Sequence, residues 1–192
     1  MAYYKCVVVI ILSIEVKLEK KRGGMMEINL VPVTFEDKEV LTNLYQFYNY
    51  DFSLFTDQDV NQHGEFEVNI DYFWEGDHRW NPYLIEVSGN VAGFVVVLFE
   101  NLDTDPDPTH VIYDFMILQK YRRNGIGTAA AIKTLDLFKE AKWKLAQMEN
   151  NKSAIAFWRK VLKDYTKDNY TERYSSDLQK YIQAFDRRGR TK

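Results

Sequence analysis

One aspartate inside an apolar stretch is the residue best suited to acid–base chemistry. The run Val111–Leu118 is apolar apart from Tyr113 and Asp114. An unpaired carboxylate buried in a strand is costly, and burial raises its pKa toward a working pH at which it accepts a proton. Strand alternation predicts that Asp114 faces away from Tyr113 and Phe115 and shares a face with Met116. The structural alternative is that Asp114 pairs with a lysine or arginine on a neighbouring element, or accepts backbone hydrogen bonds at a bulge.

A glycine turn follows this strand and has the chemistry of an anion site. The segment reads Arg122-x-x-Gly125-x-Gly127 and leads into an alanine-rich helical pattern. The first N–H groups of a helix have no internal partner, and the helix dipole places partial positive charge there. Glycine lacks a Cβ, so the backbone can approach a phosphate closely. Lys120 and Arg123 add positive charge beside the turn.

Two common phosphate loops do not match this turn. The nucleotide-triphosphate loop requires Gly-Lys-Ser/Thr, whereas this chain has Gly127-Thr128-Ala129. The dinucleotide fingerprint requires a third glycine, and Ala130 stands at that position. A nucleotide-binding domain is therefore disfavoured.

The remaining pattern resembles the acyl-coenzyme A loop of the GNAT N-acetyltransferase superfamily, which reads Gln/Arg-x-x-Gly-x-Gly/Ala. Asp114 stands eight residues before Arg122, where that family often carries a catalytic carboxylate. The segment Asn151–Trp158 resembles the family's second motif, Asn-x-x-Ala followed by an aromatic residue. The specific motifs span Asp114–Trp158, and the order of elements is similar from Met26 to Phe185.

The resemblance implies acetyl transfer from acetyl-CoA, as co-substrate, to a primary amine. It assigns Asp114 the role of base, acting through water, and the pantetheine arm to the backbone of Phe115, Met116 and Ile117. Asn151 would orient the coenzyme arm, and it also fits a plain helix N-cap. The pyrophosphate would bind the turn made by Arg122, Arg123, Asn124, Gly125, Ile126, Gly127 and Thr128.

One departure from the family pattern concerns the general acid. The family often has a tyrosine seven residues after the motif asparagine, and here that residue is Trp158. An indole N–H donates hydrogen bonds but is no acid at neutral pH. Tyr113, Tyr165, Tyr170 or water remain candidates to protonate the departing thiolate. This departure supports a rival interpretation, a non-catalytic acyl-CoA-binding sensor or interaction module.

Composition narrows the class of protein. A net charge of −3 gives no nucleic-acid footprint, and the single cysteine, Cys6, predicts no internal disulfide and a cytoplasmic location. The nine-residue apolar run Cys6–Ile14 falls short of the roughly 20 residues of a membrane span. The three histidines show no metal spacing, and Pro108 replaces the glycine that a calcium loop starting at Asp103 requires. No metal, membrane or nucleic-acid partner is expected, and the acceptor and oligomeric state stay open.

Hydrophobic periodicity predicts the helices and strands that position these residues. The order is strand, helices, hairpin, strand, helix, strand, helix, strand pair, which predicts an α+β fold with a mixed, mostly antiparallel central sheet and helices on both faces. Residues 25–192 are expected to form one domain. The predicted segments are strand Ile28–Val33, a helix beginning near Thr34–Asp37, hairpin strands Tyr83–Val87 and Val91–Phe99, strand Val111–Leu118, helix Thr128–Ala141, strand Trp143–Met148, a helix capped by Asn150 or Asn151, and strands Asn169–Tyr174 and Lys180–Phe185.

Residues 1–24 are interpreted as an extension. Lys20–Met26 reads like a translated purine-rich ribosome-binding site, which favours a start at Met25 or Met26. The alternative is a genuine extra strand, because Ile14–Glu19 alternates in hydrophobicity. The resemblance implies that the first third of the chain, which includes the aromatic stretch Phe66–Trp80, packs over the acceptor side of the site. The alternative is that these aromatic side chains fill the core and surface crevices.

Overall fold

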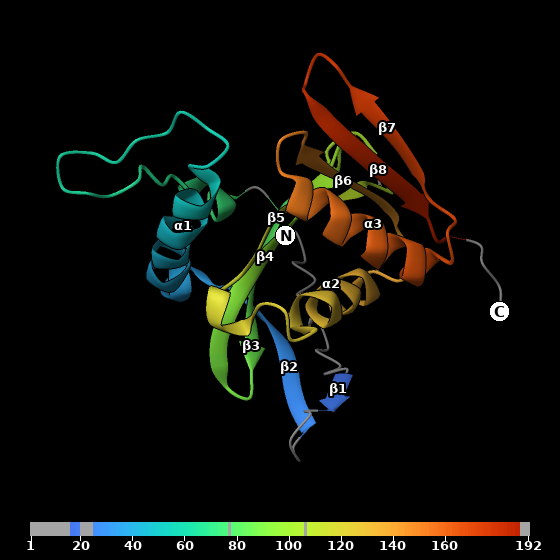
Figure 1. The fold of residues 1–192 in the computed structure, drawn as a ribbon, viewed down its shortest axis with the longest axis horizontal. Coiled ribbons are helices and arrows are strands. Elements are labelled where there is room, and N and C mark those ends of the chain that lie inside the picture. Colours follow the sequence, from blue (N-terminus) through green and yellow to red (C-terminus); the bar gives the residue numbers. More distant parts are fainter. Residues whose placement is uncertain (1–15, 20–24, 77, 106, 189–192) are drawn as a thin grey trace, which may run out of the picture.

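The computed structural model describes residues 16–19, 25–76, 78–105 and 107–188. Within them, eight strands form one sheet in the order β1-β2-β3-β4-β5-β6-β8-β7 (Figure 1). Neighbouring strands are antiparallel except β5 and β6, which are parallel. The strands are β1 (Val16–Glu19), β2 (Met25–Pro32), β3 (Trp80–Val87), β4 (Asn90–Glu100), β5 (Thr109–Ile117), β6 (Lys142–Met148), β7 (Thr171–Ser175) and β8 (Lys180–Asp186).

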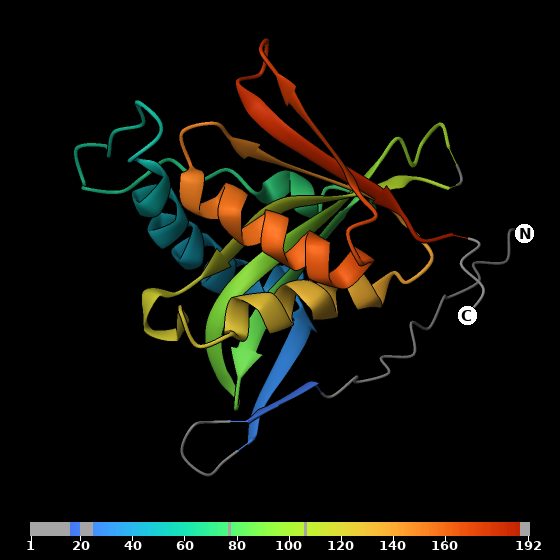
Figure 2. The same ribbon diagram turned by 45° about the vertical axis from the view of Figure 1, so that its right-hand side comes forward.

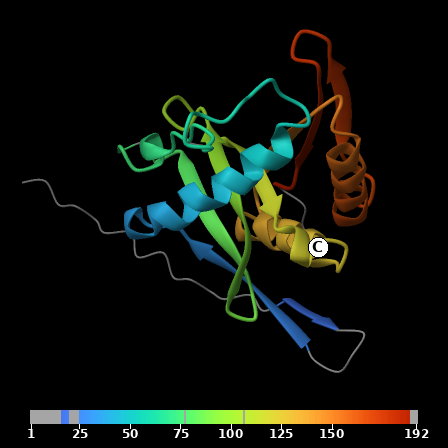
Figure 3. The same ribbon diagram turned by 60° about the vertical axis from the view of Figure 1, so that its left-hand side comes forward.

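Helices cover both faces of this sheet. The α-helices are α1 (Lys38–Phe52), α2 (Ile126–Leu137) and α3 (Lys152–Thr166), and the 3₁₀ turns are η1 (Phe35–Asp37), η2 (Asp71–Phe73) and η3 (Gln119–Tyr121). Figure 2 shows α2 and α3 in front of the sheet, and Figure 3 shows α1 in front on the opposite face. The expected α+β class, with a mixed, mostly antiparallel sheet layered between helices, is confirmed.

The core divides into two clusters because strand residues alternate between the faces. In β4, Val95 and Val97 pack with α2 and α3, while Phe94 and Val96 pack with α1. All four side chains are fully buried. Such a continuous apolar run is expected of a central strand that is covered on both sides.

Local signals set the element ends. The Thr34 N–H and hydroxyl both donate to the Asp37 carboxylate, at 3.3 and 3.0 Å, in the capping box that starts η1 and α1. Ser88 and Gly89 have φ of 49° and 75°, the positive values that a two-residue hairpin turn between β3 and β4 needs. The predicted helix start and hairpin are therefore confirmed.

The predicted C-terminal end of the alanine-rich helix is wrong. The helix ends at Leu137 rather than Ala141, because Phe138 leaves helical geometry with φ −125° and ψ 67°. The Phe138 ring packs against His110 at 4.8 Å and Trp143 at 6.1 Å between centroids. Burial against these strand residues outweighs the helical pattern of the segment.

The N-terminal extension contributes one short described strand. Strand β1 pairs antiparallel with β2, from Val16 opposite Ile28 to Glu19 opposite Met25. The apolar run Cys6–Ile14 and the segment 20–24 lie outside the described residues. In the part of the chain that the structure describes, no helix is both long and apolar enough to cross a bilayer.

Candidate active site

The site begins where the two parallel strands part. Strand β5 pairs with β6 only from Thr109 to Ile112, yet it continues to Ile117 alongside β4. Among the described residues, the backbone groups of residues 113–117 on the β6 side therefore have no strand partner. A cavity of about 600 Å³ opens at this point, within the size range of small-molecule and cofactor sites.

The walls of this cavity, called here the cleft, come from β5, α1, α2 and α3. The Phe115 ring lies 5.8 Å from Phe157 and 5.2 Å from Trp158, which makes one wall aromatic. The lining residues are Tyr48, Asp51, Phe52, Leu54, Phe55, Phe115, Met116, Ile117, Arg122, Arg123, Gly125, Gly127, Thr128, Asn151, Ser153, Ala154, Phe157 and Trp158. The resemblance placed the first third of the chain over the acceptor side of the site, but sequence reasoning singled out neither the lining residues of α1 nor Phe157.

The glycine turn forms one end of the cleft. Gly125 is the N-cap of α2 and has φ 77°, a left-handed conformation that glycine adopts without strain. The Gly125 carbonyl accepts the first helical hydrogen bond, from Ala129 N at 3.0 Å. The N–H groups of the first turn therefore point out of the helix end, in the arrangement that binds an anion. A Cβ on Gly127 would lie 3.4 Å from Phe157, so a larger side chain would crowd the wall.

The two arginines of the turn differ in their contacts. Arg122 Nε donates to the Ile117 carbonyl at 2.6 Å, and its guanidinium pairs with Asp51 at the end of α1. Arg122 therefore ties the end of β5 to α1 while lining the cleft. Arg123 also lines the cleft, and has no ion-pair partner among the described residues. It is the cation better placed to meet a phosphate.

The other predicted coenzyme residues separate into lining and supporting ones. Asn151 lines the cleft and caps α3, its Oδ1 accepting from Ala154 N at 3.0 Å and Ser153 Oγ at 2.9 Å. The plain N-cap role is confirmed, and any coenzyme contact falls to the amide NH₂ group. Asn124 is exposed beside the cleft, and the Ile126 side chain is buried in the core, which leaves backbone groups as their possible contribution.

Asp114 is held by two tyrosines of α1. Tyr48 Oη donates to Asp114 Oδ1 and Tyr45 Oη donates to Asp114 Oδ2, both at 2.6 Å. Burial raises the pKa of the Asp114 carboxyl, and the two hydrogen bonds lower it by less. The alternatives of a lysine or arginine partner or backbone donors do not describe these two contacts. A carboxyl with a raised pKa beside a cleft is the profile of a general base.

A bulge in β5 corrects one predicted orientation. Val96 lies opposite Asp114 and Val97 lies opposite Ile112, so Tyr113 is the extra residue. The Tyr113 ring contacts Trp80 at 4.9 Å on the α1 side, the same side as Asp114. The prediction that Asp114 and Tyr113 face opposite ways is wrong, because a bulge interrupts alternation.

The orientations of the next two residues were predicted correctly. Phe115 packs against α3, and Met116 packs in the α1 cluster.

None of the tyrosines proposed as general acid lines the cleft. Tyr165 donates to Asp136 at 2.8 Å, Tyr170 lies near β6 and β8, and Tyr113 is half exposed. Trp158 is only 6% exposed and packs in the core. Tyr48 is the tyrosine among the lining residues. Its spacing from Tyr45 suits one helix face, but the sequence does not link either residue to Asp114.

No group of three His, Cys, Asp or Glu side chains among the described residues is arranged to hold a metal ion.

Comparison with known proteins identifies the family. Residues 41–163 match the model of the "Acetyltransferase (GNAT) family". The chain belongs to the GNAT acetyltransferase family. The family generally uses acetyl-CoA. The cleft has an aromatic wall, a helix N-terminus that begins at a glycine, and the Arg123 guanidinium, which fit the apolar arm and the phosphates of such a coenzyme. A comparison with curated proteins finds no match.

Solved GNAT structures share the fold at low identity. An acetyltransferase from Thermus thermophilus superposes with a TM-score of 0.60 at 14% identity, over 83% of this chain and 96% of that one. The GNAT domain of S. lividans PAT gives 0.58 at 15%, over 90% and 96%. The ribosomal-protein-S18-alanine N-acetyltransferase of Escherichia coli gives 0.53 at 14%, over 86% and 97%. These likenesses establish the GNAT fold for this chain.

Proposed function

We propose that this GNAT protein transfers an acetyl group from acetyl-CoA to a primary amine, with Asp114 as the base. The observation that carries the proposal is the cleft itself. It joins an open strand edge at Phe115–Ile117, an anion-binding turn, and the tyrosine–carboxylate pair of Tyr48 and Asp114.

The residues of the cleft divide the work of binding and chemistry. The open backbone of β5 pairs with the amides of the pantetheine arm, as an added strand would. The first turn of α2 and Arg123 bind the pyrophosphate. The thioester carbonyl then lies near the bulge, where a backbone N–H stabilises the developing oxyanion. The acceptor enters from the α1 side, and its ammonium gives a proton to Asp114. A cytoplasmic location is part of the proposal, supported by the single cysteine.

The second candidate function is acyl-CoA binding without catalysis. The observation that favours it is that Trp158 is buried and stands where the family often has a tyrosine acting as general acid. Both candidates require acetyl-CoA to bind the same cleft. They differ in whether an amine acceptor turns over.

The deciding experiment measures coenzyme A release by thiol titration over a panel of polyamines, aminoglycosides, amino acids and peptides with free N-termini. Turnover on at least one amine is expected, with Asp114→Asn lowering it by roughly 10²–10⁴-fold at unchanged acetyl-CoA affinity. Acetyl-CoA binding in calorimetry without release on any acceptor would favour the sensor instead. Absence of coenzyme binding would reject both functions.

A further inference from the structure

Tyr48 stands between the cleft and the carboxylate of Asp114. Asp114 is not among the residues that line the cleft, whereas Tyr48 lines it and donates to Asp114 Oδ1 at 2.6 Å. The second carboxylate oxygen, Oδ2, accepts from Tyr45, which is only 7% exposed and does not line the cleft. Of the two tyrosines that donate to Asp114, only Tyr48 is among the residues that line the cleft.

We propose that Tyr48 relays the proton from the acceptor amine to Asp114, with Tyr45 as a positioning residue that holds the carboxylate. This inference rests on the proposed function, because it requires Asp114 to take the acceptor's proton. It replaces the water that the sequence predicted between Asp114 and the acceptor with a side chain of the protein.

The Tyr48 hydroxyl is held in place by aromatic packing. Its ring lies 4.4 Å from Phe52, 5.6 Å from Tyr45 and 5.6 Å from Phe94. A phenol hydroxyl donates one hydrogen bond and accepts others. Since its proton is directed to Asp114, its oxygen remains able to accept a proton from an ammonium in the cleft.

The groups around Asp114 oppose ionisation of the Tyr48 hydroxyl to a tyrosinate. The titratable side chains that interact with Asp114 are Tyr45 and Tyr48 from α1, Tyr72 from η2 and Tyr113 from β5. The β4 residues on the same side of the sheet as Asp114, Phe94 and Val96, are apolar. Burial beside the carboxylate keeps the pKa of the Tyr48 hydroxyl well above its usual value, and burial raises the pKa of Tyr72 to about 12. Tyr48 therefore stays protonated and passes a proton on only by receiving another.

The relay balances in protons and bonds. An ammonium N–H breaks as that proton binds Tyr48 Oη, and the original Tyr48 proton moves to Asp114 Oδ1. The freed nitrogen lone pair forms the C–N bond to the thioester carbonyl, and the C–S bond breaks. The departing thiolate takes the second proton from the nitrogen. Asp114 then returns its proton to Tyr48 Oη as the proton that Tyr48 took from the amine passes to solvent in the cleft. This restores the carboxylate and the Tyr48 hydrogen bond to it.

The test compares Tyr48→Phe with Tyr45→Phe. Each variant removes one hydrogen bond to the same carboxylate, and only the first does so at a residue that lines the cleft. We measure acetyl-CoA affinity by calorimetry and kcat against pH for wild type, both tyrosine variants and Asp114→Asn, with the best amine of the panel.

Tyr48→Phe is expected to lower kcat by roughly 10²–10⁴-fold at every pH, with acetyl-CoA affinity kept within about threefold. Tyr45→Phe is expected to move the acidic limb of the profile to higher pH, because the carboxylate loses a donor, while its high-pH plateau falls by less than about tenfold.

Three results would overturn the relay, and they separate it from the proposed function. If both tyrosine variants show the same small loss and the same shift of the limb, water carries the proton and the transferase function stands. If Asp114→Asn keeps wild-type kcat, Asp114 is not the base and no relay to it exists. If the wild type turns over no amine, the proposed function fails and the relay fails with it.

Discussion

The buried carboxylate of Asp114 costs folding stability, and the same carboxylate is the group proposed to accept the proton. Burial in β5 opposes its ionisation, and two tyrosine hydroxyls offset part of that cost. Proteins often keep such costs at functional sites, where replacing the charged group gains stability and loses activity. The pH dependence of folding therefore tests the environment of Asp114 without an acceptor.

Asp114→Asn is expected to melt at the same temperature as wild type or a few degrees higher at pH 8. The folded-state pKa of this carboxyl is raised, so wild-type stability falls as pH rises from the unfolded pKa through the folded pKa. Asparagine does not ionise, so the difference between the two proteins should shrink toward pH 4. Thermal melts across pH check this, and a variant several degrees less stable at pH 8 would instead make Asp114 an anchor for α1.

The sequence identified Asp114 but not its partners. An acid inside an apolar strand is visible in the chain, and so is its spacing from Arg122. Tyr45 and Tyr48 lie 69 and 66 residues away, on a helix whose packing angle no local pattern records. Such contacts depend on tertiary geometry and escape a reading based on periodicity.

At the scale of elements, the turn between β5 and α2 is the best-predicted part of the site. Glycines were expected there for backbone conformation and close approach. Gly125 has φ 77°, and Gly127 lies beside Phe157, where an added Cβ would meet the ring. The sequence raised a bulge only as a possible setting for Asp114 and did not place it at Tyr113, because inserting one residue into a ladder leaves no mark in hydrophobicity.

Gly125→Val is expected to abolish detectable acetyl-CoA binding while the protein stays folded. A β-branched residue resists φ 77°, so the turn shifts its N–H groups away from the pyrophosphate. Calorimetry measures the affinity, and thermal melting reports the fold.

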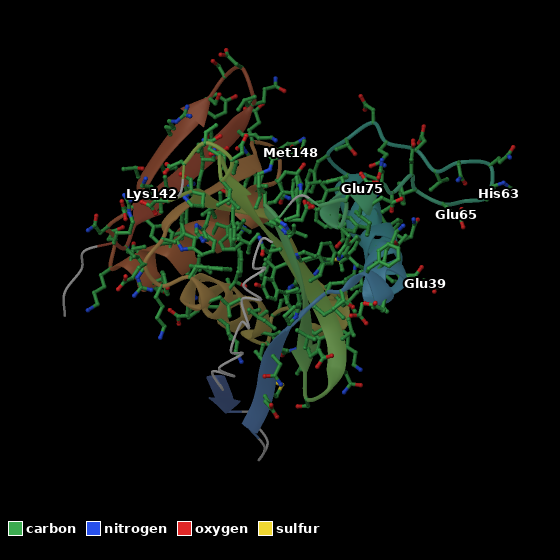
Figure 4. All side chains as sticks on the ribbon, turned by 180° about the vertical axis from the view of Figure 1, so that it is seen from behind. Glu39, His63, Glu65, Glu75, Lys142 and Met148 are labelled. Atoms are coloured by element: carbon green, nitrogen blue, oxygen red, sulfur yellow. The ribbon has the colours of Figure 1, made fainter. Side chains whose placement is uncertain are left out.

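Gly64→Val is the matched control for this substitution. Gly64 has φ 76° and open space around its Cβ position, as Gly125 does, so both variants carry the same kind of backbone strain. Gly64 lies between His63 and Glu65, which Figure 4 shows at the outer end of the loop beyond α1. Wild-type affinity in Gly125→Val, or equal losses in both variants, would contradict the assignment of the turn.

At the scale of the whole molecule, the order of helices and strands was predictable from the sequence. The separation of β5 from β6 was not. Alternation and turn residues located every strand from β2 to β8. The cleft exists because β5 pairs with β6 over only four residues, Thr109–Ile112, before they separate. The point at which two strands stop pairing depends on tertiary geometry, which no single segment encodes.

Strand pairing in the sheet also predicts how much the N-terminal segment contributes to the stability of the fold. In the described part of the chain, strand β1 lies at one edge of the sheet and pairs with β2 alone, while β2 continues from Ile28 along β3 to the Tyr83 position. Lys133 of α2 donates to the Ile28 carbonyl, so β2 is anchored without β1. The cleft lies on the far side of β3 and β4 from this edge.

A chain that starts at Met26 is therefore expected to keep its fold and its acetyl-CoA affinity, with a melting temperature within about 2–4 °C of the full chain. The loss of β1 exposes an edge of β2, and an exposed edge promotes association between copies, so light scattering accompanies the melt. If the shortened chain is insoluble, or binds acetyl-CoA tenfold more weakly, then β1 is required to hold β2 and α2 in place. Because β1 contacts α2, whose first turn carries Gly125 as its cap, such a result would make the extra strand part of what positions the anion-binding turn.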